Sequence, residues 1–183
     1  MLELARKCDA RILLTSSSEI YGDCASSLIY EEDSGNVNCF SKRACYSEGK
    51  RISETLFFNY KDFYNVDIRI ARIFNTYGPR MQPNDGRVIS NLIVQALNNK
   101  NLSIYGDGLQ TRSFCYVDDL IKGLYLLMGS KLNKPINLGN SKEFTIKSLA
   151  FIIKNQINPN LDFIYKKLPS DDPRRRNPSL ALA

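Results

Sequence analysis

The residues best suited to chemistry lie in the run CYSEGK at 45–50, where Tyr46 and Lys50 are four positions apart. The apolar positions Ile52 and Leu56 that follow predict a helix, which would place both side chains on one face about one turn apart. A lysine ammonium beside a phenol favours the phenolate and lowers the pKa of the phenol from its ordinary value of about 10. Tyr46 is therefore a candidate general base near neutral pH. By itself, the spacing also fits an exposed tyrosine–lysine pair on an ordinary amphipathic helix.

A second polar cluster, Thr-Ser-Ser-Ser-Glu at 15–19, follows a short apolar segment at 10–15 that is typical of a buried strand in a parallel sheet. Open α/β sheets build their ligand sites at the carboxyl ends of such strands. The hydroxyls and the carboxylate of this cluster are therefore candidates for chemistry, although a polar exit from a strand is the alternative. A second strand, at 66–73, ends in a similar polar loop at 74–80.

The composition narrows the class of protein. The chain has 183 residues, of which 43% are hydrophobic, enough for one domain or a domain with a small lobe. The net charge of +6 comes mostly from scattered residues, and the one dense basic run, at 174–176, is separated from two aspartates by a single proline. No basic stripe with interleaved aromatics predicts a nucleic-acid groove, so a small anionic ligand is the better expectation.

The chain contains no histidine, which excludes Ser-His-Asp catalysis, Cys-His catalysis and any histidine-ligated metal site, so we expect no metal. Its five cysteines form no CxxC pair and suggest reduced thiols in a reducing compartment. No apolar run approaches the roughly 20 residues of a membrane span, and the first residues do not resemble a targeting peptide. These features predict a cytoplasmic location.

Strand and helix patterns alternate along the chain, which predicts an α/β fold with a parallel sheet. The periodicity predicts helices over 43–64, 88–98, 117–128 and 145–156, the last with a cap near Phe144 or Thr145. Short strands are predicted at 102–105, 113–116, 136–138 and 161–165.

Several of these segments together resemble the extended short-chain dehydrogenase/reductases that act on nucleotide sugars. Tyr-x-x-x-Lys alone is a weak motif, but it gains specificity between a Ser-Ser-Ser-Glu-Ile-Tyr-Gly segment and an Asn-Thr-Tyr-Gly-Pro-Arg loop. Within this family, the chain is most similar to the UDP-glucuronate decarboxylases. The segments are TSSSEIYG (15–22), CYSEGK (45–50), RIARIFNTYGPRM (69–81), DGRVISNLIVQAL (85–97), YGDGLQTRSFCYVDDL (105–120), NLGNS (137–141) and DDPRRRNPS (171–179).

The resemblance implies the C-terminal half of a Rossmann-type parallel sheet, formed by residues 1–80 and 117–140, with a smaller sugar-nucleotide-binding lobe over 81–183. The family begins with a strand, a Gly-x-x-Gly-x-x-Gly turn and a helix that bind the NAD pyrophosphate through backbone N–H groups. No such turn is present in these residues. We therefore expect an internal piece of the fold, incomplete at its C-terminal end, with an apolar sheet edge at 12–14.

The resemblance also implies roles for single residues. Tyr46 would take the proton from the sugar 4-hydroxyl as hydride moves to NAD. Lys50 would lower the pKa of Tyr46 and bind the nicotinamide ribose, while Ser17 would hydrogen-bond the same sugar hydroxyl. Tyr46, Lys50 and Thr76 would together form the part of the NAD site within this chain.

Three further positions match residues of the decarboxylating members: Ser18, Glu19 and Arg176. Oxidation at C4 makes the uronate a β-keto acid, so CO2 leaves with its electrons drawn toward the new carbonyl. A guanidinium suits a planar carboxylate because it can bind both oxygens. A 4,6-dehydratase would be expected to have Asp-Glu in place of the Ser18-Glu19 pair.

Substrate and partner contacts follow from the same resemblance. The UDP-sugar would contact four residues, and the helix of Tyr46 would join two subunits into a homodimer. Three hypotheses remain: a UDP-glucuronate decarboxylase active when joined to its missing half, a related 4-epimerase or 4,6-dehydratase, and a catalytically silent, dimerising fragment. Relatives occur in the cytosol and in the Golgi lumen. The four substrate positions are Tyr60, Asn75, Arg87 and Arg112.

Overall fold

The computed structural model describes residues 1–24, 27–41, 44–168 and 176–183. Its centre is a parallel sheet with the order β1-β2-β7, formed by β1 (Ile12–Ser17), β2 (Ile68–Ile73) and β7 (Pro135–Leu138). The register sets Ile12 opposite Ile68 and Ile70 opposite Pro135. The predicted α/β fold with a parallel sheet is confirmed.

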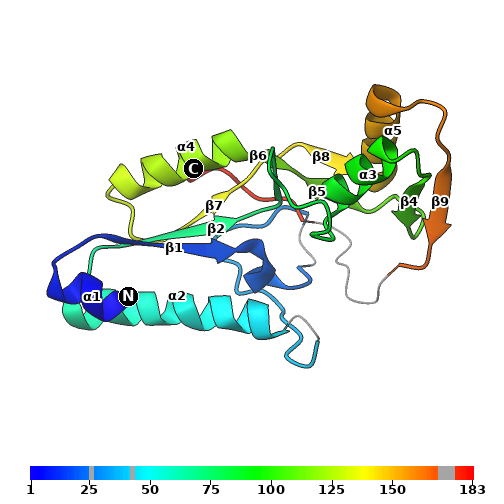
Figure 1. The fold of residues 1–183 in the computed structure, drawn as a ribbon. Helices are drawn as coiled ribbons and strands as arrows, with labels where there is room; N and C mark the ends of the chain where they lie inside the picture. The colour runs from blue at the N-terminus through cyan, green and yellow to red at the C-terminus, as the bar shows by residue number, and fades with distance from the viewer. Residues whose placement is uncertain (25–26, 42–43, 169–175) are drawn as a thin grey trace.

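Helices cover both faces of this sheet, so the body has three layers (Figure 1). On one face lie α1 (Leu2–Lys7) and α2 (Ala44–Tyr64), and on the other lies α4 (Val117–Gly129). Alternate residues of β2 enter the two resulting cores. Ile68 and Ile70 pack with Phe57 of α2, whereas Ala71 packs with Leu120 of α4. Burial on both sides explains why β2 is apolar along most of its length.

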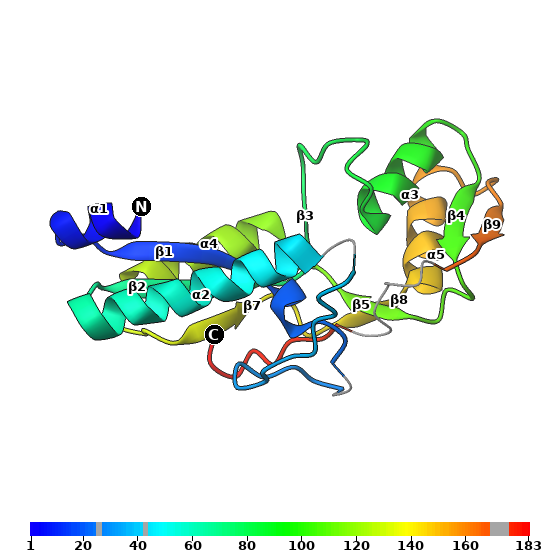
Figure 2. The same ribbon diagram turned by 90° about the horizontal axis from the view of Figure 1, so that it is seen from below.

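A smaller lobe extends from one end of the body (Figure 2). In it, β4 (Leu102–Tyr105) pairs in parallel with β9 (Phe163–Lys166), and α3 (Val88–Leu97) and α5 (Ile146–Ile157) pack against β4. The Thr145 side chain caps α5 by accepting a hydrogen bond from the Ser148 N–H at 3.0 Å. The cap and the ends of these elements lie within two residues of the predicted positions.

The segment between body and lobe differs from the single strand predicted at 113–116. It forms β5 (Thr111–Ser113), antiparallel to β8 (Glu143–Thr145), and then β6 (Cys115–Tyr116), parallel to β3 (Thr76–Tyr77). Phe114, between the two strands, packs against the lobe core. The alternation of apolar and polar residues shows which residues form a strand but not which strand they pair with. It therefore could not reveal that this segment changes partners at Phe114.

The chain returns to the body at residues 176–179. The Ile29 N–H donates to the Asn177 carbonyl at 2.9 Å, and the Ser179 N–H donates to the Ile29 carbonyl at 2.7 Å. Residues 176–179 are all buried. The last part of the predicted lobe range therefore lies against the sheet body.

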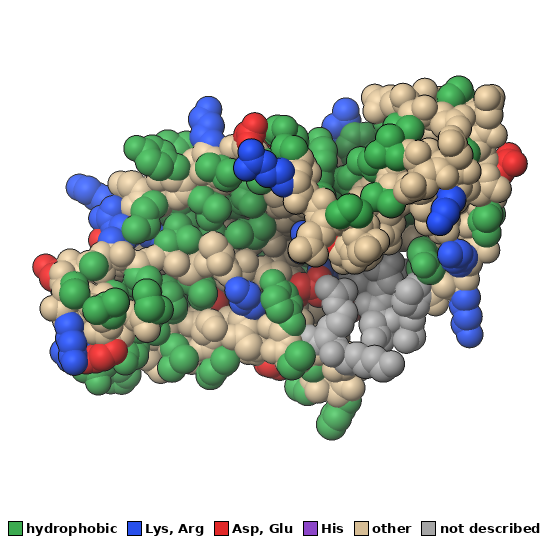
Figure 3. All heavy atoms as spheres, in the orientation of Figure 1, with side chains coloured by type: hydrophobic (Ala, Val, Ile, Leu, Met, Phe, Trp, Pro, Cys, Tyr) green, Lys and Arg blue, Asp and Glu red, His purple; other side chains and the backbone are tan. Residues whose placement is uncertain are grey.

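β1 lies at the edge of the sheet, pairing only with β2 in the part of the chain that the structure describes. This agrees with the free sheet edge expected at residues 12–14, whose side chains are half-buried. Figure 3 shows hydrophobic side chains gathered between α4 and β1, and Ile121, Tyr125 and Leu126 of α4 are exposed. Among the described helices, none combines the length and the apolar character needed to cross a bilayer.

Candidate active site

The first turns of α2 lie beside the carboxyl end of β1, because the helix runs antiparallel to that strand (Figure 1). The Lys50 ammonium donates a hydrogen bond to the Thr15 carbonyl at 2.7 Å and lies 5.8 Å from the centre of the Tyr46 ring. Tyr46 is 49% exposed, so its phenol is accessible. The structure thus brings the tyrosine–lysine pair to the strand end that carries the serine cluster.

The serine cluster forms the junction between β1 and the short 3-10 helix η1 (Ser18–Tyr21). The Ser17 hydroxyl oxygen accepts the Glu19 N–H at 3.2 Å and so caps this helix. A hydroxyl that accepts a hydrogen bond can still donate its own hydrogen. Ser18 is 3% exposed, so it is a buried residue and not a surface group. Sequence reasoning predicted a polar loop here and missed the helix.

Glu19 meets Arg176, which is 157 positions away in the sequence. The guanidinium binds the carboxylate with both terminal nitrogens, and the Nη2–Oε2 distance is 3.1 Å. Arg176 is 5% exposed, and its Nε has no hydrogen-bond partner among the described residues. Two of the three predicted decarboxylase residues are therefore in direct contact. The rest of the basic run, at 174–175, and the aspartates at 171–172 lie outside the described residues.

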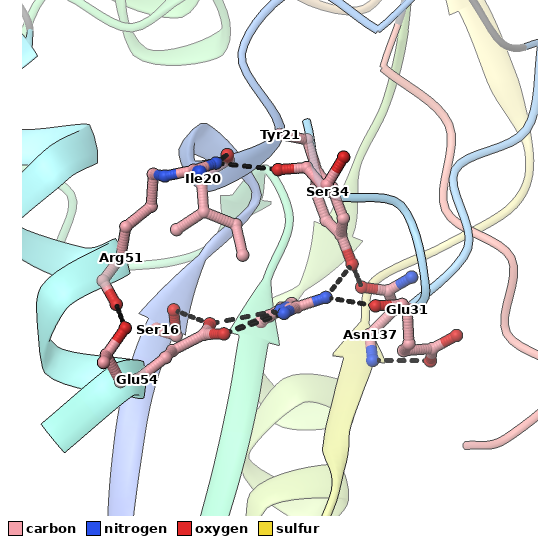
Figure 4. Close-up of polar contacts among 10 residues, drawn as sticks. Ser16, Ile20, Tyr21, Glu31, Ser34, Arg51, Glu54 and Asn137 are labelled. Carbon is pink, nitrogen blue, oxygen red and sulfur yellow. Dashed lines mark hydrogen bonds and ion pairs between the residues drawn. The ribbon is translucent and has the colours of Figure 1, made fainter. Parts of the chain in front are cut away.

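A buried polar network lies behind these groups (Figure 4). The Glu54 carboxylate of α2 accepts hydrogen bonds from the Ser16 hydroxyl at 2.5 Å and from the Arg72 Nη2 at 2.8 Å. The side chains of Arg72 and Glu54 are only 10% and 7% exposed. Burial by itself lowers the pKa of Arg72, but the hydrogen bond and the charge of Glu54 outweigh it and raise that pKa. This ion pair fixes α2 to the sheet.

The network continues from Arg72 along the same face of the sheet to β7, where Asn137 is its neighbour in register. Arg72 donates to the Tyr21 hydroxyl at 2.8 Å, and that hydroxyl donates to Asn137 Oδ1 at 2.7 Å. Asn137 is fully buried, and its N–H donates to the Glu31 carboxylate at 2.9 Å. Burial raises the pKa of Tyr21 to about 12, despite the nearby Arg72, so its hydroxyl stays a donor.

Sequence reasoning missed this network. One signal was present: Glu54 continues the four-residue spacing of Tyr46 and Lys50, which places it on the same helix face. A second was the pair of arginines, Arg69 and Arg72, inside an otherwise apolar strand. Buried charged groups need partners, so a buried arginine implies a buried acid elsewhere.

Two of the predicted UDP contacts lie near the junction of body and lobe. Asn75 directly follows Phe74 at the end of β2 and accepts the Cys115 N–H at its carbonyl. Arg112 in β5 is 7% exposed and donates to the Thr111 carbonyl at 2.8 Å, so it is not a solvated surface residue. Thr76 begins β3, and its hydroxyl donates to the Phe74 carbonyl at 2.9 Å.

The other two residues predicted to contact the UDP-sugar, Arg87 and Tyr60, are placed less favourably for that role. Arg87 precedes α3, and its side chain is 69% exposed, 3.6 Å from the Asp85 carboxylate. Tyr60 is not brought to the site. It lies fourteen residues beyond Tyr46, or about 21 Å along the helix axis. Its ring packs beside Tyr64 with the core at the opposite end of α2. Helical spacing places Tyr60 near the same face of the helix as Tyr46, but the rise along the axis separates the two side chains.

Comparison with known proteins agrees with the motifs. The model of the NAD dependent epimerase/dehydratase family matches residues 1–139. UDP-glucuronic acid decarboxylase 3 of Arabidopsis thaliana is 51% identical over all 183 residues, which are 54% of its length. UDP-glucuronic acid decarboxylase 1 of Xenopus tropicalis is 48% identical over the same residues, 44% of its length. The chain therefore spans about half the length of the curated relatives it matches.

A solved structure shows the same arrangement of elements. The UDP-glucuronic acid 4-epimerase from Bacillus cereus, in complex with UDP-glucuronic acid and NAD, superposes with a TM-score of 0.85 at 26% identity. The match covers 99% of this chain and 56% of the epimerase chain. The family model covers most of the chain, and the fold and motifs agree with it. The chain belongs to the NAD dependent epimerase/dehydratase family.

Proposed function

We propose that this chain is the catalytic half of a UDP-glucuronate decarboxylase, which converts UDP-glucuronate to UDP-xylose through a 4-keto intermediate. The main support for the proposal is the contact between Glu19 and Arg176. It lies next to the carboxyl end of β1, where Lys50 of the Tyr46–Lys50 pair also binds. The similarity to curated decarboxylases over the whole chain supports it. Because the chain spans about half of those relatives, the activity belongs to the assembled protein.

The first step is removal of hydrogen from C4 of the sugar. The Tyr46 phenolate takes the proton of the 4-hydroxyl, and the Ser17 hydroxyl orients the same oxygen. Lys50 holds a positive charge near the phenol ring. When bound, NAD would supply reversible hydride transfer at C4, and Tyr46 would return its proton to the C4 oxygen when the ketone is reduced. Lys50 and Thr76 are the residues of this chain that would contact it.

The second step is loss of CO2 from the 4-keto acid. The C5–carboxylate bond breaks, its electron pair moves toward the C4 carbonyl, and a proton is then added at C5. Arg176 would bind the departing carboxylate, which competes with the Glu19 carboxylate for the guanidinium. Two carboxylates beside one guanidinium repel each other, which destabilises the bound uronate relative to neutral CO2. Glu19, once freed from Arg176, would take up a proton from solvent and deliver it to C5.

Product analysis tests this function. The chain is joined to the glycine-rich N-terminal half of a relative and supplied with NAD and UDP-glucuronate. We expect UDP-xylose and CO2. Formation of the 4-epimer, UDP-galacturonate, would instead support the epimerase hypothesis and overturn the decarboxylase.

NAD binding by the 183-residue chain alone tests the role of the missing half. Without the glycine turn, the pyrophosphate has few backbone donors, so we expect weak or undetectable binding in a calorimetric titration. Micromolar affinity would contradict this expectation and show that the chain holds the cofactor unaided.

The proposal includes a homodimer formed through α2. The helix exposes the apolar side chains Ile52, Leu56 and Phe63, which a second copy would cover. We expect Leu56→Asp to shift the protein from dimer to monomer in sedimentation equilibrium. All five cysteines are unpaired, which favours the cytoplasmic location that we also propose.

A further inference from the structure

The two candidate catalytic pairs are held by one continuous buried network. One end is the Glu54–Arg72 ion pair, which fixes the helix of Tyr46 and Lys50. The other end is Asn137, whose side-chain amide donates to the Ile29 carbonyl at 3.1 Å and to the Ser179 carbonyl at 3.4 Å.

Ile29 in turn holds the segment that carries Arg176. It exchanges two backbone hydrogen bonds with Asn177 and Ser179, at 2.9 and 2.7 Å, on either side of Pro178. The position of Asn137 therefore fixes the backbone next to Arg176.

The Tyr21 hydroxyl joins the side chains at the two ends. The Tyr21 oxygen accepts the Arg72 hydrogen bond and donates to Asn137 Oδ1, with both distances under 3 Å. Tyr21 is fully buried and lies in η1, two residues after Glu19. It thus connects the element of Glu19 to the residue that holds the Arg176 segment. Glu31 also bridges the two residues, since its backbone carbonyl accepts from Arg72 at 2.6 Å and its carboxylate accepts the Asn137 backbone N–H at 2.9 Å. Tyr21 differs in hydrogen-bonding to the side chains of both residues.

We infer that Tyr21 is a positioning residue that sets the Glu19–Arg176 pair relative to the Tyr46–Lys50 pair, so that the carboxylate and the 4-hydroxyl of one sugar are engaged together. Because its side chain is fully buried, Tyr21 would touch neither the substrate nor the cofactor. The inference rests on the proposed function, because UDP-glucuronate is the ligand that would use both pairs. The hydrogen bonds of the network are present in the structure whether or not the function is correct.

The test compares the 183-residue chain with its Tyr21→Phe variant, which removes one oxygen atom and keeps the ring. The first readout is amide hydrogen exchange at Ile29 and Ser179, whose N–H groups form the two bonds to be loosened. The variant removes the hydroxyl that donates to Asn137 Oδ1, so Asn137 should hold the Ile29 and Ser179 carbonyls less firmly. We therefore expect the exchange of these two amides to quicken about 10-fold relative to the amides of β2. Unchanged rates, or equal acceleration of every amide, would overturn the inference.

The second readout is ligand discrimination, which a merely structural role would not alter. Calorimetry gives the ratio of affinities for UDP-glucuronate and UDP-xylose, which differ by the carboxylate. We expect Tyr21→Phe to lower this ratio about 10-fold and to leave UDP-xylose binding unchanged. An equal loss for both ligands would contradict positioning of Arg176. Tyr77→Phe is the matched control, since that ring packs on Tyr116 outside the network.

The two readouts separate the inference from the proposed function. If the unsubstituted chain does not favour UDP-glucuronate over UDP-xylose, the proposed reading of the carboxylate by Arg176 fails. The exchange rates at Ile29 and Ser179 then decide by themselves whether Tyr21 positions the segment.

Discussion

Replacement of Glu54 by glutamine measures how strongly the buried ion pair fixes α2 to the sheet. The substitution keeps the shape of the side chain and removes the charge that faces Arg72. The Arg72 Nε lies 3.1 and 3.2 Å from the two Glu54 oxygens and its Nη2 lies 2.8 Å from one of them. After the change, a guanidinium that is only 10% exposed has no counter-charge at that position.

Removing one partner of a buried pair costs about 3–5 kcal/mol, because the other charge stays out of water. We expect Glu54→Gln to lower the free energy of unfolding by about 3 kcal/mol. With a urea dependence of about 2 kcal/mol per M, the midpoint should fall by about 1.5 M. Urea unfolding followed by circular dichroism gives both quantities.

A control lies on the same helix. Glu48 forms an exposed ion pair with Arg51 at 3.6 Å, so Glu48→Gln should cost less than about 0.5 kcal/mol. The double variant Glu54→Leu/Arg72→Met should lose clearly less than the sum of its single variants, because it leaves no buried charge. The reasoning would be refuted by a Glu54→Gln cost no larger than the Glu48 control, or by additive single and double effects.

Three further predictions concern single residues. Gly22→Ala should lower the free energy of unfolding by more than about 2 kcal/mol, since φ is +59° and a Cβ would lie 2.0 Å from the Asn36 carbonyl oxygen. Gly49→Ala in α2, with open space around it, should instead raise that free energy by up to about 1 kcal/mol. Thermal unfolding of both variants compares these effects. Burial by itself raises the pKa of Asp67, but hydrogen bonds from Arg11 and Arg69 hold that pKa below its ordinary value of 3.8. The stability that Asp67 contributes is therefore present above its ordinary pKa and is lost as the pH falls through its lower pKa in the folded protein. Asp67→Asn removes this titration, so the urea midpoint should fall less steeply below about pH 4. Arg176→Lys keeps the charge but loses the bidentate contact, and turnover of UDP-glucuronate by the assembled protein should fall at least about 10-fold without a matching loss of stability.

The sequence predicted most of what local pattern controls. Apolar periodicity located α2 and α5 to within about two residues, and the alternation of elements predicted the parallel sheet. The spacing of Tyr46 and Lys50 was enough to place them together, because neighbours on one helix face meet wherever the helix packs.

Long-range contacts were harder to predict. Pattern gives no distance between residues 157 positions apart, so the contact between Glu19 and Arg176 could come only from the resemblance or from coordinates. The arginines of β2 were a different difficulty. An alternating strand is usually half exposed, yet Arg69 and Arg72 are 2% and 9% exposed because helices cover both faces. Their partners lie on other elements, which a single-strand pattern cannot identify.

The proposed chemistry requires one sugar to be engaged at two ends, by Tyr46 at its 4-hydroxyl and by Arg176 at its carboxylate. A crystal structure of the chain joined to an NAD-binding half, with UDP-glucuronate bound, tests it most directly. We predict the 4-hydroxyl oxygen at about 2.6–3.2 Å from the Tyr46 phenol oxygen, and the carboxylate within hydrogen-bond reach of Arg176. A sugar whose carboxylate points away from Arg176 while its 4-hydroxyl contacts Tyr46 would contradict the account.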